Sequence, residues 1–281
     1  MTSTNVGLLH PGAMGVTVGA TCRADVLWCA DGRSAATVDR AEAAGLRAVP
    51  SLREVVDRSD VIVSVCPPDR AVGVARSVAE CGFGGVFVDA NAVAPSTARE
   101  IGGMFERFVD GGIVGPPVER VGTTRLYLSG DDRSDVSGVA DLWSGGSLDA
   151  RVIDGGVGAA SAVKMAYATW TKVSGALLLD VRALARVEGV EEELLAEWAI
   201  SQPGTAERSA ATASGVAPKA WRFIGEMEQV TTAFRDAGLP AGFAEGANEV
   251  YDRLAGFKDD PDVDLDEVLE RLLARPPTDL Q

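Results

Sequence analysis

The segment Val6-Gly-Leu-Leu-His10-Pro-Gly12-Ala-Met-Gly15 is a short apolar run followed at once by a glycine-containing turn. Apolar residues at helical spacing come next, so we expect a strand, a tight turn and a helix. The turn has the form G-x-G-x-x-G with His10 in place of the first glycine. Gly12 lets the backbone approach a ligand, and Gly15 permits close packing of the helix on the strand.

A turn of this form, placed between a first strand and a helix, predicts binding of a dinucleotide pyrophosphate at the free N–H groups of the helix. The residues expected to contact the cofactor here are His10, Gly12, Ala13, Met14 and Gly15. The alternative is an ordinary strand–helix turn. His10 either lies beside the cofactor or is a turn residue without a chemical role.

A second candidate cofactor contact follows the next apolar run, residues 26–29. In such folds an acid at this point binds the ribose of NAD, whereas an arginine accommodates the 2′-phosphate of NADP. Asp31 is an acid, while Arg33 and Ser34 combine a planar guanidinium donor with a hydroxyl. We therefore expect NADP rather than NAD. The alternative for Arg33 is a solvated residue at the start of a helix.

Residues 5–153 alternate short apolar runs with helical stretches, a pattern typical of a parallel sheet covered on both faces. The expected strands are Val6–Leu9, Val26–Cys29, Asp60–Cys66, Val86–Asp89 and Phe108–Asp110, with Arg125–Ser129 and Arg151–Ile153 as later edge strands.

The pattern changes after Asp154. Residues 159–187 form one helical run without proline, rich in Ala and Gly, which we expect to be buried on most sides. Further helices are expected at 191–201, 218–236, 241–255 and 264–274. The sequence thus predicts an α/β Rossmann-type domain at residues 1–154 and an all-helical substrate and dimerisation domain at residues 155–281, joined by a long interdomain helix.

The 281-residue chain has a net charge of −15, which argues against binding of nucleic acid or anionic lipid. The most apolar stretch, residues 155–181, carries Lys164 and Lys172 and fails the test for a membrane span. The N-terminus lacks a basic region and contains Pro11, so we do not expect a signal peptide.

Four cysteines without CxxC spacing and a single histidine argue against a metal site. The cysteines, Cys22, Cys29, Cys66 and Cys81, are expected to be reduced core residues of a cytoplasmic protein.

Six motifs follow one another along the chain: Gly12-Ala-Met-Gly15, Cys66-Pro67-Pro68, Asp89-Ala-Asn91-Ala-Val-Ala-Pro95, Phe108-Val-Asp110-Gly-Gly, Gly122-Thr-Thr and Gly158-Ala-Ala-Ser-Ala-Val-Lys164-Met165. In this order they resemble the 6-phosphogluconate dehydrogenase/β-hydroxyacid dehydrogenase superfamily over nearly the whole chain. The C-terminal half, with Ala199–Pro203 and Pro218–Met227, resembles the poorly characterised phosphogluconate dehydrogenase-like branch.

The resemblance implies that Lys164 is the catalytic lysine, the general acid/base of a hydroxyl–carbonyl interconversion. It places Cys66, Pro67 and Pro68 in the loop beside the adenosine and nicotinamide ribose. Asn91 falls where the family has a Ser, Thr or Asn near substrate and nicotinamide. Val114-Gly115-Pro116 falls on the family's Ser-Gly-Gly, which holds a substrate carboxylate. A homodimer is implied as well.

The residues around Lys164 support this role independently. Lys164 is one of only four lysines and lies on a mostly apolar helical stretch. Burying an ammonium is costly unless something uses it, and partial desolvation lowers a lysine pKa toward the range suited to proton transfer. The alternative is a lysine that reaches solvent from the start of a helix.

The chain departs from the family pattern at three points. Tyr167 stands near the place of the usual Asn, and its hydroxyl either replaces that donor or belongs to a packed aromatic side chain. Val114 lacks a hydroxyl and Pro116 lacks an N–H, which puts a small β-hydroxy acid bound in the usual way in doubt. Arg222 is the candidate for an anionic substrate group.

Taken together, these features predict an NADP-dependent oxidoreductase that moves hydride between the nicotinamide and a hydroxyl or carbonyl carbon of a small, acidic substrate. Lys164, Asn91 and Tyr167 are its candidate catalytic residues, and Val114, Gly115, Lys164 and Arg222 its candidate substrate contacts. The alternatives are an NADPH-dependent imine reductase and a nucleotide-binding protein without turnover.

Overall fold

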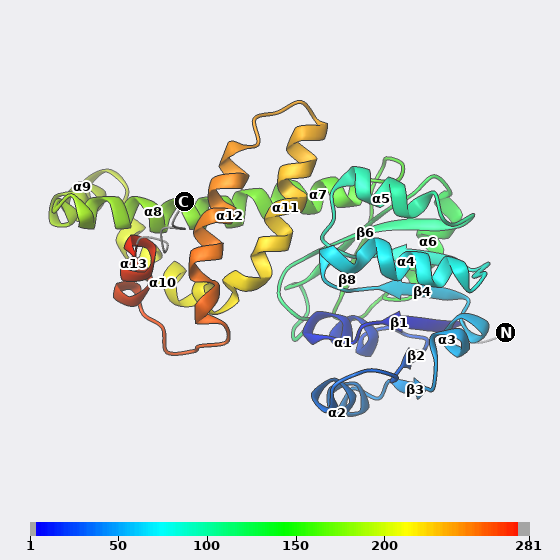
Figure 1. Cartoon of the computed structure of the whole chain (residues 1–281). Helices are drawn as coiled ribbons and strands as arrows, with labels where there is room; N and C mark the ends of the chain where they lie inside the picture. The colour runs from blue at the N-terminus through cyan, green and yellow to red at the C-terminus, as the bar shows by residue number, and fades with distance from the viewer. Residues whose placement is uncertain (1–3, 275–281) are drawn as a thin grey trace, which may run out of the picture. The chain divides into compact units, whose positions relative to one another are not determined.

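The computed structural model of the chain describes residues 4–274. It consists of two compact units, Met1–Tyr167 and Ala168–Gln281 (Figure 1). The division lies later than the 154/155 boundary expected from the sequence. The reason is that helix α7 (Ala159–Ala168) packs with the sheet of the first unit, where the backbone of Ala160 lies against Gly112.

The first unit contains one eight-stranded sheet in the order β3-β2-β1-β4-β5-β6-β7-β8. Its strands are β1 (Asn5–Leu9), β2 (Asp25–Cys29), β3 (Arg47–Val49), β4 (Val61–Ser64), β5 (Val86–Asp89), β6 (Phe108–Val114), β7 (Arg125–Ser129) and β8 (Asp149–Val152). All neighbours are parallel except β6 and β7, which are antiparallel. The expectation that β7 is an edge strand is wrong, because β8 pairs with its outer side.

Apolar residues alternate between the two faces of this sheet, since successive side chains of a strand point to opposite sides. Leu8 and Val63 contribute to one core cluster, and Leu9 and Ile62 contribute to the other. The helices that cover the first face are α1 (Ala13–Ala20), α2 (Ala35–Ala43) and α6 (Arg133–Asp141). Those on the second face are α3 (Leu52–Arg58), α4 (Ala71–Glu80) and α5 (Pro95–Gly102). The predicted Rossmann-type architecture is confirmed.

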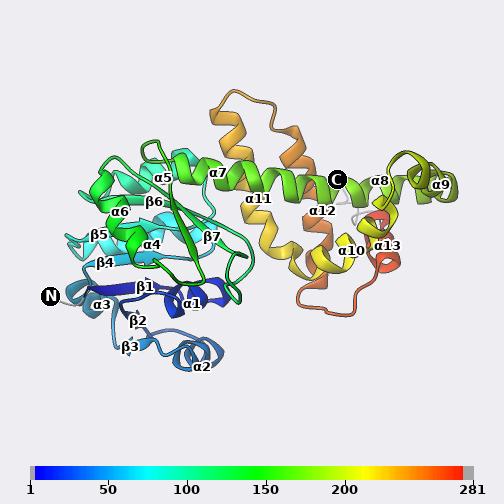
Figure 2. The same cartoon turned by 180° about the vertical axis from the view of Figure 1, so that it is seen from behind.

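The second unit is all-helical within the described residues, as predicted (Figure 2). Its elements are the π-helical turn η2 (Thr169–Val173), α8 (Ser174–Val187), α9 (Glu191–Ser201), α10 (Thr205–Val216), η3 (Ala217–Lys219), α11 (Ala220–Asp236), α12 (Gly242–Leu254), η4 (Ala255–Phe257) and α13 (Leu265–Leu273). None of the helices within residues 4–274 combines the length and apolar character that a membrane span requires.

Helical conformation continues from α7 through η2 into α8, so the predicted run over residues 159–187 is present, with a π turn in its middle. A π turn disturbs the regular backbone hydrogen bonding of a helix. Here the hydroxyl of Tyr251 on α12 donates to the carbonyl oxygen of Lys172 at 2.5 Å. The expectation that this run is buried on most sides is wrong for the single chain. Trp170, Leu177 and Leu184 are 76%, 59% and 61% exposed.

Candidate cofactor and substrate site

The predicted site residues of the first unit follow the ends of neighbouring parallel strands. His10 comes directly after β1, Arg33 follows β2, Cys66 follows β4, Asn91 follows β5, and Val114 ends β6. The carboxyl ends of parallel strands meet at one edge of a sheet, which is where open α/β sheets bind ligands. The structure therefore brings these five residues to the same edge.

The turn after β1 has the backbone shape of a glycine turn although it carries a histidine. His10 has a φ of 66°, in the left-handed region that favours glycine. The Gly12 N–H donates to the His10 carbonyl at 2.7 Å, and a Cβ on Gly15 would lie 2.5 Å from that same oxygen. Position 15 therefore requires glycine for the close approach of α1 to the turn.

Helix α1 begins directly after this turn, with Ala13 and Met14 in its first turn. No side chain caps its N-terminus, and its first turn carries no acidic residue. The N–H groups of an uncapped helix start attract anions. This end of α1 fits the pyrophosphate of a dinucleotide.

A pocket of about 230 Å³ opens beside the turn and brings two predicted cofactor residues together. It is lined by Leu8, Leu9, His10, Cys29, Arg33, Leu52, Val74 and Ser77. Inside it, His10 Nδ1 and Arg33 Nε are buried without a hydrogen-bond partner in the protein. Buried polar atoms are normally paired, so these two atoms fit a polar ligand. Ser34, next to Arg33, is exposed and hydrogen-bonds Thr37 at 3.1 Å.

His10 is neutral in this pocket. Burial, reinforced by the positive charge of Arg33, lowers the pKa of His10 to about 4. Arg33 is thus the charged donor of the pocket, and His10 adds an uncharged ring beside it.

Asn91 is almost fully buried and connects the loops after β4 and β5. Its Oδ1 accepts the backbone N–H of Cys66 at 2.6 Å, and its Nδ2 donates to Ser64 Oγ at 3.1 Å and to Asp89 Oδ1. The amide therefore fixes the loop that continues into Pro67 and Pro68. Burial raises the pKa of the Cys66 thiol to about 12, so this cysteine remains protonated.

Lys164 lies on α7, which packs closely on β6. A Cβ on Gly112 would lie 2.5 Å from the carbonyl oxygen of Ala160 and 3.2 Å from Lys164 Cβ. The base of the Lys164 side chain therefore sits over β6, two residues before Val114 at the end of that strand. The lysine is partly buried.

The start of α7 is held by Asp110 on β6. Its carboxylate accepts the Gly158 N–H at 3.0 Å, the Ser161 N–H at 2.9 Å and the Ser161 hydroxyl at 2.6 Å. Lys164 is three residues beyond Ser161, so the same carboxylate fixes the helical turn from which the lysine extends.

The segment aligned with the family's carboxylate-binding loop has no hydroxyl at its first position. Val114 is buried, and Gly115 has a φ of 123°, packed against the backbone of Thr123. Thr124 Oγ1 donates to the Pro116 carbonyl at 2.6 Å. This loop is thus held by residues 123–124.

Two further predicted site residues, Tyr167 and Arg222, are exposed. Tyr167, at the end of the first unit, is 45% exposed, which does not fit an aromatic core residue. Arg222 belongs to the second unit, on α11, where it is exposed and its guanidinium carbon lies 5.9 Å from the centre of the Trp221 ring.

A row of polar side chains that was not predicted from the sequence crosses the sheet. Ser64, Asp89, Asp110 and Ser129 pair in register on β4, β5, β6 and β7, and all four are fully buried. Each aspartate closes an apolar run, Val86-Phe-Val-Asp89 and Phe108-Val-Asp110. A charged residue at the end of an apolar run was the signal in the sequence that could have indicated buried polar groups here.

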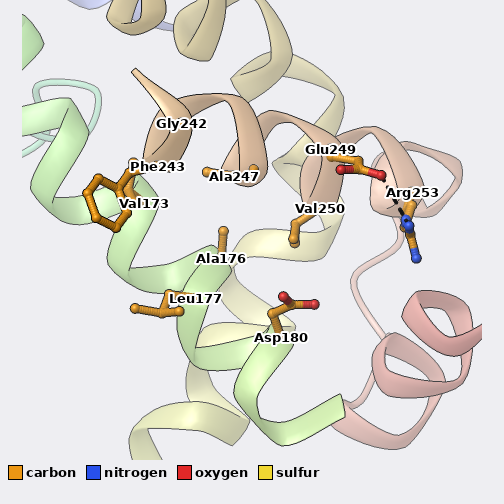
Figure 3. Close-up of a pocket in the computed structure, with 11 residues that line it drawn as sticks. Val173, Ala176, Leu177, Asp180, Gly242, Phe243, Ala247, Glu249, Val250 and Arg253 are labelled. Atoms are coloured by element: carbon orange, nitrogen blue, oxygen red, sulfur yellow. Dashed lines mark hydrogen bonds and ion pairs between the residues drawn. The ribbon is translucent and has the colours of Figure 1, made fainter. Parts of the chain in front are cut away.

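A further pocket, of about 260 Å³, lies within the second unit between α8 and α12 (Figure 3). Its walls combine apolar side chains, such as Leu177 and Phe243, with Asp180, Glu249 and Arg253. Glu249 and Arg253 form an ion pair at 3.2 Å. No cofactor contact was predicted here.

Comparisons with known proteins agree with this architecture. Residues 185–254 match the model of a family described as a domain of unknown function, DUF1932. An uncharacterized 28.5 kDa protein in the 7S RNA 5′ region of Methanothermus fervidus is 29% identical over 175 residues. That match covers 62% of this chain and 66% of that protein, just under two thirds of its length.

Solved structures extend the likeness over nearly the whole chain. Conserved protein MTH1747, of unknown function and structurally similar to 3-hydroxyacid dehydrogenases, is 25% identical over 90% of this chain and 97% of its own, with a TM-score of 0.67. Mycobacterium tuberculosis 3-hydroxyisobutyrate dehydrogenase, solved with L-serine, is 18% identical over 97% and 100%, with a TM-score of 0.70. A reductive aminase from Aspergillus terreus, solved with NADPH and ethyl-5-oxohexanoate, is 20% identical over 90% and 93%, with a TM-score of 0.54.

The chain therefore has the two-part fold of the 3-hydroxyacid dehydrogenases, and the resemblance to the β-hydroxyacid dehydrogenase superfamily predicted from its motifs is confirmed.

Proposed function

We propose that the protein is an NADP-dependent oxidoreductase that transfers hydride between the nicotinamide and a hydroxyl or carbonyl carbon of a small substrate. The observation that carries this proposal is the placement of Lys164. Its helix packs on β6 near the strand end, at the sheet edge that also carries the turn after β1. A proton-transferring group and a dinucleotide turn at one sheet edge are what such a reaction requires.

The cofactor would be held by the residues of the first two strand ends. The N-terminus of α1 would bind the pyrophosphate, and Arg33 would supply a charged donor for the 2′-phosphate. NADP supplies the hydride chemistry when bound. Its use by this chain is supported by the buried, unpartnered Arg33 Nε and by the reductive aminase that was solved with NADPH.

Lys164 would donate a proton to the substrate oxygen during reduction and accept it during oxidation. Asn91 would act through the loop that it holds after β4, since its amide is engaged by Ser64, Asp89 and Cys66. The substrate would be a small molecule; the similar dehydrogenase was solved with one, L-serine. Because Val114 lacks a hydroxyl and Pro116 lacks an N–H, a substrate carboxylate would need a partner other than this loop.

Imine reduction is the second candidate. It is favoured by the likeness to the reductive aminase and by Tyr167, which is 45% exposed and lies one helical turn beyond Lys164. A tyrosine hydroxyl in that position would be a second proton donor on the same face of α7.

A substrate screen tests the proposal. Alcohols, 3-hydroxy acids, ketones and cyclic imines would be offered to the protein with NADPH or NADP and, in parallel, with NADH or NAD. Steady turnover of a hydroxyl or carbonyl compound with the phosphorylated cofactor is expected. Turnover of imines alone would favour the second candidate. Cofactor binding without turnover of any compound would refute the proposal and favour a nucleotide-binding protein without turnover.

We also propose that the protein acts as a homodimer. Several large apolar side chains of the second unit are exposed, among them Trp170, Leu177, Leu184 and Phe243, which we call the exposed apolar set. Leu177 and Leu184 are two helical turns apart on one side of α8, a spacing typical of helix–helix seams. A second copy of the chain would cover this exposed apolar set.

The four cysteines are free, as in a reducing compartment, so we place the protein in the cytoplasm.

A further inference from the structure

Asp89 and Asp110 form a side-by-side pair inside the sheet. They are register partners on the parallel strands β5 and β6, so their side chains leave the same face about 4.8 Å apart. Both are fully buried. Two carboxylates in such a place cannot both be ionised without a large electrostatic cost, and one of them therefore keeps a proton.

The hydrogen-bond donors around the pair are unevenly distributed. Asp110 accepts four hydrogen bonds: three from Gly158 and Ser161 at the start of α7, and one from the Ser129 hydroxyl at 3.2 Å. The guanidinium of Arg99 on α5 also lies close to Gly158. Burial raises the pKa of Asp110, but these hydrogen bonds oppose the rise because they stabilise the carboxylate.

Asp89 has fewer donors. Asn91 Nδ2 donates to its Oδ1, while its Oδ2 is buried without a hydrogen-bond partner. Ser64 lies opposite on β4, and Cys66, on which the charge of Asp89 acts, is a protonated thiol. Burial, together with the negative charge of Asp110, raises the pKa of Asp89 to about 7.

We propose that Asp89 and Asp110 share one proton, that Asp89 is the neutral member and orients the Asn91 amide, and that Asp110 is the ionised member and positions Lys164 through the first turn of α7. This assignment makes both aspartates positioning residues. One member of the pair is hydrogen-bonded to Asn91, which holds the loop after β4, and the other is hydrogen-bonded to the start of the helix that carries the general acid/base.

The part of the proposal that concerns Lys164 rests on the proposed function, but the division of charge does not. Two isosteric variants separate the roles of the pair. Asp89→Asn mimics a neutral carboxyl group and is expected to fold and bind NADPH as the wild type does. Asp110→Asn places a side-chain NH₂ donor against the N–H and hydroxyl donors of α7. Because two donors cannot bond each other, the start of that helix is expected to loosen.

Infrared spectroscopy measures the protonation of the carboxyl pair, and hydrogen exchange measures the stability of α7. Neither experiment needs a substrate. Near pH 6, where ordinary aspartates with a pKa of about 3.9 are ionised, the wild type should show the band of a protonated carboxyl group. That band should disappear in Asp89→Asn. Amide exchange over residues 158–167 should accelerate in Asp110→Asn and stay unchanged in Asp89→Asn. If Asp110→Asn does not fold, Ser161→Ala takes its place, because it removes only one donor to Asp110.

Turnover then tests the positioning role. Ser161→Ala should lower kcat several-fold while leaving the KM for NADPH unchanged, since the cofactor contacts lie at β1 and β2. A protonated-carboxyl band that persists in Asp89→Asn, or equal exchange in the two aspartate variants, would overturn the assignment. Failure of the substrate screen would refute the proposed function but would leave both spectroscopic results valid.

Discussion

Asp110 on β6 accepts both the backbone N–H of Ser161, at 2.9 Å, and the hydroxyl of the same residue, at 2.6 Å. These two bonds join the sheet of the first unit to the start of the helix that carries Lys164. The helical turn from which the lysine extends is therefore held by a buried carboxylate 54 residues earlier in the chain.

Arg33→Ala should weaken NADPH binding and leave NADH binding nearly unchanged. A charge-assisted contact to the 2′-phosphate contributes about 1.5–3 kcal/mol, which corresponds to at least a tenfold change in the dissociation constant. Fluorescence titration with each cofactor measures the effect. Arg40→Ala, at an exposed arginine of α2, is the matched control. Equal losses for both cofactors would show that Arg33 does not meet the phosphate.

His10→Asn should make the folding stability less sensitive to acid. Asparagine tolerates the left-handed conformation that His10 adopts, with its φ of 66°. Because the pKa of His10 falls from 6.5 to about 4 on folding, the unfolded chain takes up the proton first. The wild type therefore loses stability as the pH falls from 6.5 toward 4, and the histidine contributes its full share only above 6.5.

Urea unfolding at several pH values checks this prediction. Relative to the wild type, the free energy of unfolding of His10→Asn should improve steadily across that acidic interval. A constant difference between the two proteins at every pH would contradict a neutral, buried His10.

Gly112→Ala should push α7 away from β6. The new Cβ would lie 2.5 Å from the carbonyl oxygen of Ala160 and 3.2 Å from Lys164 Cβ. Overpacking of this kind costs about 1–3 kcal/mol. We expect a lower melting temperature and reduced turnover with NADPH binding retained. Gly138→Ala on α6, where a Cβ meets nothing within 4 Å, is the control and should be neutral or stabilising. A variant at 112 that behaved like the control would disprove the tight contact.

Leu184→Glu should convert the proposed dimer to a monomer. The leucine is 61% exposed in the single chain, so a charge there harms the monomer little but would be buried between two copies. Light scattering measures the particle mass. Leu239→Glu, at a 55% exposed leucine outside the exposed apolar set, should leave the mass unchanged. An active wild-type particle of 29.2 kDa would end the dimer proposal.

Most of the fold could be predicted because its elements have strong local signals. The strand β4 is a continuous apolar run, and α9 was predicted with the bounds that the structure shows, residues 191–201. Two elements were missed. The strand β3 is only Arg47-Ala-Val49, too short for a pattern, and α10 has no apolar periodicity strong enough to indicate a helix.

The site could be predicted only as separate residues. Motif order located His10, Asn91 and Lys164, but nothing local indicates that Asp89 and Asp110 are register partners. Pairing between strands depends on the packing of the whole sheet, so the sequence shows an aspartate at the end of each apolar run but not that the two are partners. The exposure of Leu184 was missed for a related reason, since a single sequence does not distinguish apolar residues covered within one chain from those left for a second copy.

The most direct test of the central claim is turnover by Lys164→Met, measured together with NADPH binding. Methionine is a good helix former, so α7 should persist. We expect kcat to fall by about 10²-fold or more, the scale of a lost general acid/base, while the affinity for NADPH is unchanged. The limb of the pH–rate profile that belongs to the lysine should disappear as well. Wild-type turnover in this variant would contradict the account and make Tyr167 the next proton donor to test.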